Sequence, residues 1–166
     1  DRVMNREFKD ALEDSPVIAA IKDDNGLKEC LKSDIQVVFI LYGDICNIAD
    51  IVDTVKQAGK MALVHLDLIN GLSAKDVAVD FIKKYTKADG IISTKPALIK
   101  HAGEIGLTSV LRLFVIDSMA YENIQKHVKG ARPDVIEVLP ACGRGSRPGR
   151  SRRSTCCASF WTRTCR

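Results

Sequence analysis

The sequence lacks a long hydrophobic run. No stretch approaches the roughly 18 consecutive apolar residues that a membrane-spanning helix needs, and the first ten residues are too highly charged for a secretory signal. We therefore predict a cytoplasmic protein that has no membrane partner.

Several common signatures of catalysis and phosphate binding are also missing. The sequence contains neither the GxGxxG nor the GxxxxGKS pattern, and it has no GxSxG nucleophile elbow and no HExxH motif. Four of the six cysteines lie after residue 140 without a CxxC pair or a histidine among them, which does not support a zinc site. We predict free thiols, no metal, no cofactor and no catalytic residue.

The charge is divided unevenly along the chain. The net charge is +4, but residues 143–166 contain seven arginines and no acidic residue. Without those seven, 18 basic residues face 21 acidic ones, which leaves a net charge of −3 for the rest. This remainder therefore has no strongly basic composition of the kind that marks a nucleic-acid-binding domain.

Short apolar runs alternate with helical patterns along the first 140 residues. The 166 residues, 46% hydrophobic and 28% charged, are ordinary for one globular domain. Apolar, β-branched segments predict six strands, at 16–21, 37–42, 61–69, 90–94, 108–116 and 135–139. Five helices are predicted between them: from Asp23 or Asp24 to about 33, at 48–58 and 73–86, from Pro96 and from Ser118. Such alternation is typical of a parallel sheet covered on both faces.

A closed barrel and an open doubly wound sheet both fit this pattern, and the polar residues favour the barrel. An open sheet usually gathers them at one switch point, whereas a barrel collects them from the C-terminal ends of many strands. Here they lie at or near the end of every strand: Lys22, Asp44, His65, Asp67, Lys95, Asp117 and Glu137. We predict an α/β fold of the (β/α)8 TIM-barrel type, incomplete because only about six strands are present.

His65, Asp67 and Lys95 are candidates for ligand binding. His65 and Asp67 are two residues apart on a predicted strand, so both should point to the barrel interior as a base, a phosphate partner or half a metal site. A polar layer without function would fit equally well. Lys95 precedes Pro96 at a predicted helix start, which suits an anion, although an exposed lysine explains it equally well.

Arg112 and Glu137 each stand among apolar neighbours, in LRLFV and VIEVL. A lone buried charge is costly unless it is paired. The two are therefore expected to pair with each other or with a polar ligand.

The segment after Pro140 differs from the rest in composition. Residues 141–166 contain no lysine, aspartate, glutamate, isoleucine, leucine or valine. We predict a truncated barrel domain at 1–140, and a tail at 141–166 that forms no seventh strand and is disordered or out of frame. An arginine-rich RNA-binding arm is the functional alternative for the tail.

The stretches ALEDSPVIAAIKDD, QVVFILYGDICNI, HLDLINGL, DGIISTKPALI, LRLFVIDSMA and RPDVIEVLP resemble the glycerol-3-phosphate-responsive antiterminator family. The resemblance runs from about Glu7 to Pro140, and the family's pattern is lost beyond it. It implies a (β/α) barrel that senses glycerol 3-phosphate and binds the leader mRNA of a glycerol-uptake operon, where it prevents premature transcription termination. Such a regulator is not an enzyme.

The resemblance implies that these polar residues form a sensor pocket. Lys22, Lys95 and Arg112 are candidate contacts for the anion or polyol, and Asp44, His65, Asp67 and Glu137 are candidate partners for hydroxyl groups. A barrel enzyme that acts on a small phosphorylated substrate is the alternative, suggested by His65, Asp67 and Lys95. The open edges of an incomplete barrel also make pairing with a second copy, a homo-oligomer, an expected state.

Overall fold

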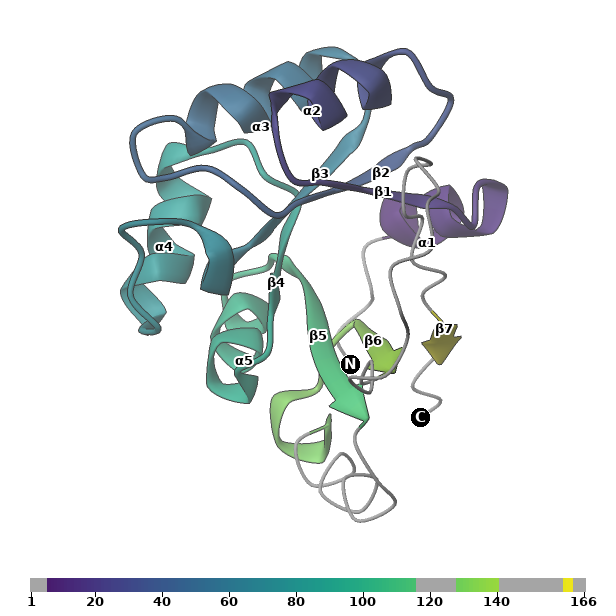
Figure 1. The fold of residues 1–166 in the computed structure, drawn as a ribbon. Helices are drawn as coiled ribbons and strands as arrows, with labels where there is room; N and C mark the ends of the chain where they lie inside the picture. Colours follow the sequence, from purple (N-terminus) through teal and green to yellow (C-terminus); the bar gives the residue numbers. More distant parts are fainter. Residues whose placement is uncertain (1–5, 116–127, 141–159, 163–166) are drawn as a thin grey trace, which may run out of the picture.

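The computed structural model describes residues 6–115, 128–140 and 160–162 (Figure 1). The elements in chain order are α1 (Arg6–Asp14), β1 (Ile18–Ile21), α2 (Asp24–Leu31), β2 (Val37–Ile40), α3 (Ile48–Gln57), β3 (Met61–His65), the 3-10 turn η1 (Leu66–Leu68), α4 (Asp76–Tyr85), β4 (Gly90–Ser93), α5 (Pro96–Glu104), β5 (Thr108–Val115), β6 (Val135–Pro140) and β7 (Phe160–Thr162). Residues 128–131 are also helical.

The strands form one curled sheet in sequence order. Strands β1 to β6 are all parallel, and each pairs with the next along the chain. Helices α2 to α5 lie along the outer side of the curl (Figure 1). The predicted incomplete barrel is confirmed as a half-barrel of six parallel strands.

Two separate apolar clusters cover the two faces of the sheet. Between the sheet and the outer helices lie residues such as Val38, Val64 and Leu111. The inner face carries a second cluster of Phe8, Val37, Phe39, Leu63, Ile92, Val110 and Val135. Burial on both faces explains why the strands are almost continuously apolar in sequence.

Helix α1 was not predicted. It supplies Phe8, which is fully buried against the inner face of the sheet. Ala11 and Leu12, three and four residues later, pack on the same cluster. This spacing is that of one helix face, so α1 fills part of the interior of the half-barrel.

The predicted starts of α2 and α5 are confirmed, whereas α4 begins at Asp76, three residues after its predicted start. Asp23 is the N-cap of α2, where its Oδ1 accepts a 2.7 Å hydrogen bond from Gly26 N. Pro96 occupies the first turn of α5. Gly59 follows α3 with a φ of 73°, a conformation that glycine adopts without strain.

The third strand is shorter than predicted. It ends at His65, and residues 66–68 turn into η1 rather than continuing to residue 69. Beyond His65 neither β2 nor β4 offers a paired residue. His65 and Asp67 therefore do not lie on one strand.

The prediction that residues 141–166 form no seventh strand is wrong at three positions. Phe160–Thr162 form β7, which pairs antiparallel with β6. Phenylalanine, tryptophan and threonine favour strands, and the outer edge of β6 offers unpaired backbone groups. The predicted disorder of the tail and most of the helix predicted from Ser118 fall on 141–159, 163–166 and 116–127, outside the described residues.

Candidate functional site at the C-terminal ends of β3 to β6

Arg112 and Glu137 form a buried ion pair on the inner face. They are direct neighbours in the register of β5 and β6. Arg112 Nε donates to Glu137 Oε2 at 2.6 Å, and Nη2 donates to Oε1 at 3.2 Å. The two side chains are 10% and 4% exposed. The predicted pairing is confirmed. A guanidinium carries five N–H donors, and two of those of Arg112 donate to Glu137.

His65 ends β3 on the same inner face, two residues after the inner-face Leu63. It is 2% exposed, and its Nδ1 has no hydrogen-bond partner among the described residues. Burial, and next the positive charge of Arg112, lower the pKa of His65 to about 4, although Asp67 opposes this shift. The imidazole is therefore neutral at pH 7. Buried polar atoms such as its Nδ1 are usually hydrogen-bonded, so a polar ligand atom would suit this position.

This histidine should make the stability depend on pH. The pKa of a histidine in the unfolded chain is 6.5, and that of His65 in the folded protein is about 4. The unfolded chain therefore takes up the proton first, so stability is complete above pH 6.5 and falls as the pH drops toward 4, by up to about 3 kcal/mol. Urea unfolding at pH 7.5 and 4.5 measures this loss. The His65→Gln variant should lose less stability than the wild type over that interval, and an equal loss would contradict the assignment.

Asp67 holds the loop between β4 and α5. Its Oδ1 accepts a 3.0 Å hydrogen bond from Ser93 Oγ, and its Oδ2 accepts from Thr94 N and Thr94 Oγ1 at 2.8 and 2.7 Å. Burial alone would raise the pKa of Asp67, but the hydrogen bonds from Thr94 and Ser93 outweigh it and lower the pKa. The carboxylate is thus ionised and engaged by protein groups.

Lys95 stands beside this loop at the N-cap of α5. Its Nζ lies 3.8 Å from Asp67 Oδ1, and its side chain is 49% exposed. The backbone N–H of Lys95 donates to Ser93 Oγ at 3.0 Å. Ser93 and Thr94 were missed from the sequence, where the only signal was their place directly before Lys95 and Pro96.

Lys22 and Asp44 lie elsewhere, on the β1 and β2 side of the sheet. Lys22 follows β1 and is exposed. Asp44 follows β2, and its Oδ1 accepts from Cys46 N at 2.8 Å and from Asn47 N at 3.1 Å, which shapes the turn into α3. The structure therefore brings five of the seven candidates together along β3 to β6, and a binding role for any of the seven stays a prediction.

The described part of the chain holds no group of three or more His, Cys, Asp or Glu residues placed to bind a metal ion. Cys30 and Cys46 are free thiols, the first buried and the second exposed. Among the described helices, none is long and apolar enough to cross a membrane.

Comparison with known proteins identifies relatives of this chain. Over 131 residues it is 47% identical to the uncharacterized protein YgcP of Escherichia coli (strain K12), a match that covers 79% of this chain and 69% of YgcP. Its structure is similar to that of the glycerol uptake operon antiterminator regulatory protein from Listeria monocytogenes str. 4b F2365, with a TM-score of 0.72, 32% identity and coverage of 76% of this chain and 69% of the other.

A glycerol uptake operon antiterminator-related protein from Thermotoga maritima MSB8 is also similar, with a TM-score of 0.68, 37% identity and coverage of 74% and 69%. The family match spans residues 17–152, so it extends twelve residues past Pro140, the predicted boundary. With most of its length matched, the chain belongs to the glycerol-3-phosphate responsive antiterminator family.

Proposed function

We propose that this chain senses glycerol 3-phosphate with the C-terminal ends of β3 to β6 and, in response, binds the leader mRNA of a glycerol-uptake operon to prevent premature transcription termination. The observation that carries the sensor site is the buried Nδ1 of His65, which has no hydrogen-bond partner in the described part of the chain and lies near the Arg112–Glu137 pair. Membership of the family supports the effector and the regulatory role.

The chemistry of these side chains suits a phosphorylated polyol. The phosphate needs a cation and an N–H donor. The Lys95 ammonium and the backbone N–H of Ala97, in the first turn of α5, are the groups of that kind at this helix start. The hydroxyl groups need neutral or acceptor partners, and the neutral imidazole of His65 and the carboxylate of Glu137 are of that kind. Arg112 is a further proposed contact, and Asp67 is proposed to act on the ligand through the loop that it holds. A binding role for Lys22 and Asp44 stays a prediction, because both lie on the β1 and β2 side of the sheet.

The proposal is tested by transcription in vitro across a glycerol-uptake leader that contains its terminator. Addition of the protein with glycerol 3-phosphate should raise the fraction of full-length transcript above that with either alone. Unchanged termination under all conditions would refute the proposal. The alternative, an enzyme acting on a small phosphorylated substrate, would instead require turnover that His65→Ala abolishes.

Lys95 is expected to contribute directly to effector affinity. The Lys95→Ala variant should bind glycerol 3-phosphate about tenfold more weakly, as loss of one charge-assisted contact at a half-exposed position would produce. Isothermal titration calorimetry measures the dissociation constant. Lys75→Ala, which removes an exposed lysine at the N-cap of α4, is the matched control and should bind as the wild type does. If the Lys95→Ala variant binds glycerol 3-phosphate as tightly as the wild type, Lys95 does not contact the effector.

A further inference from the structure

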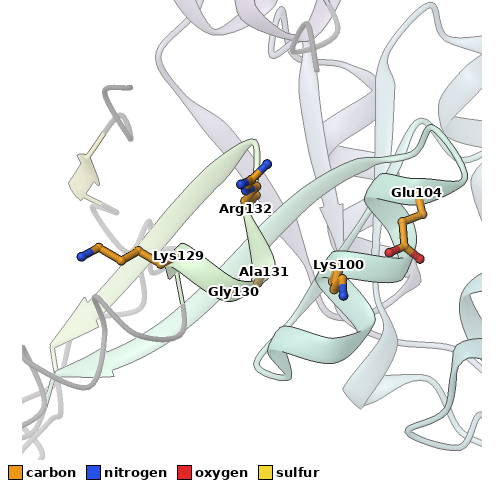
Figure 2. Close-up of a pocket in the computed structure, with 6 residues that line it drawn as sticks. All are labelled: Lys100, Glu104, Lys129, Gly130, Ala131 and Arg132. Carbon is orange, nitrogen blue, oxygen red and sulfur yellow. The ribbon is translucent and has the colours of Figure 1, made fainter. Parts of the chain in front are cut away.

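A second polar region lies at the opposite end of the sheet. A cavity of about 400 Å³ is lined by Lys100, Glu104, Lys129, Gly130, Ala131 and Arg132. Figure 2 shows that α5 and the segment leading into β6 contribute these residues from two sides. The segment at 129–132 ends shortly before β6, which begins at Val135. Since β1 to β6 are parallel, the cavity lies at the end where strands begin, away from the candidate sensor site.

Positive charge dominates this cavity. Lys100, Lys129 and Arg132 are exposed, and none of the three forms an ion pair with a described residue. The single carboxylate, Glu104, has Oε2 only 3.7 Å from Nδ1 of His101. The chain without its arginine-rich tail carries a net charge of −3, from 18 basic and 21 acidic residues. The three cations are therefore a local concentration in an acidic domain.

Arg132 occupies a backbone conformation that arginine rarely adopts. Its φ is 48°, in the left-handed region, and its N–H donates to Val128 O at 2.9 Å to close the preceding helical turn. Glycine or asparagine is the usual residue at such a position. A cation at a strained position beside a cavity is consistent with a functional role, although the charge cluster carries the inference.

The same end of the sheet carries further cations next to an exposed ring. Helix α4 packs against α5, and its last turn contains Lys83 and Lys84. Tyr85 is 59% exposed, and Lys84 Nζ lies 5.2 Å from the centre of its ring. Cations that bind phosphates, placed near aromatic rings that stack on unpaired bases, are the usual elements of a surface for single-stranded nucleic acid.

We infer that the basic surface formed by Lys83, Lys84, Tyr85, Lys100, Lys129 and Arg132 binds the phosphate backbone of the leader RNA. This inference rests on the proposed function, to which it adds the face that contacts RNA. A polyanion fits better than one small anion because the cations extend over α4, α5 and the segment that precedes β6. Effector and RNA would then bind at opposite ends of β4, β5 and β6, without competing for the same side chains.

The test uses the full chain and a fluorescently labelled transcript of a glycerol-uptake leader, with unrelated RNA as competitor. The triple variant Lys100→Gln/Lys129→Gln/Arg132→Gln should bind at least about tenfold more weakly, and the slope of log affinity against log salt should fall by about 2. The control triple variant Lys9→Gln/Lys28→Gln/Lys75→Gln removes the same charge from α1, α2 and the N-cap of α4. It should bind RNA as the wild type does.

All three proteins retain the arginine-rich tail, so differences between them report on the basic surface alone. Wild-type affinity and salt slope in the first variant, or equal weakening in both variants, would overturn the basic surface and leave the proposed function intact. A wild type that binds no leader RNA, with or without glycerol 3-phosphate, would overturn the proposed function and the basic surface with it. Thermal melts with glycerol 3-phosphate verify that each variant folds and keeps its effector response.

Discussion

Replacing Glu137 with alanine is expected to lower the free energy of unfolding by about 3–5 kcal/mol, because it leaves the buried guanidinium of Arg112 without its counter-ion. The pair is almost inaccessible to solvent, with the Glu137 side chain 4% exposed, and its shorter hydrogen bond is 2.6 Å. Equilibrium urea unfolding at pH 7.5 measures the change.

The double variant Arg112→Met/Glu137→Leu distinguishes two contributions to the free energy of unfolding: the cost of one buried charge without a partner and the net stabilisation by the ion pair. Replacing both partners by apolar residues is expected to change the stability little, because two desolvated charges are removed together. The double variant should nevertheless lose its response to glycerol 3-phosphate, because the proposed site loses two of its polar groups. A double variant as unstable as Glu137→Ala would contradict this energetic account, and a double variant that still responds to the effector would contradict the site.

The second large effect is expected at Phe8. This ring is fully buried against the inner face of the sheet and connects α1 to the core. Phe8→Ala should cost about 3–5 kcal/mol of unfolding free energy, from lost burial and the cavity that remains. Val77→Ala on α4, where Val77 is 62% exposed, should change stability by less than about 0.5 kcal/mol. If Phe8→Ala is no more destabilising than Val77→Ala in urea unfolding, α1 is not part of the cooperative fold.

The architecture could be predicted from sequence because its signals are local. Each of β1 to β6 is a short, largely apolar run, and the starts of α2 and α5 are marked by the recognisable residues Asp23 and Pro96. The pairing of Arg112 with Glu137 could also be predicted from the sequence, since a charge in the middle of an apolar strand needs a partner. Helix α1 had a signal too, in the spacing of Phe8, Ala11 and Leu12, but the charged residues around them concealed it.

The details of the site depended on contacts between distant residues. The carboxylate of Asp67 binds Ser93 and Thr94, 26 and 27 residues away, and nothing within HLDLINGL indicates those partners. The same contacts explain why two alternating positions, His65 and Asp67, do not share a strand. The low pKa of His65 likewise depends on burial and on Arg112, which lies on another strand. Local sequence patterns therefore predict neither the hydrogen-bond partners of Asp67 nor the low pKa of His65.

Thermal melts of this chain with millimolar glycerol 3-phosphate, glycerol or inorganic phosphate test the central claim most directly. A ligand that binds only the native state must raise the melting midpoint. The account predicts a cooperative melt whose midpoint rises with glycerol 3-phosphate, and rises less with glycerol or phosphate because each supplies only part of the ligand. A cooperative melt whose midpoint is the same under all conditions would contradict the claim that the ends of β3 to β6 sense glycerol 3-phosphate.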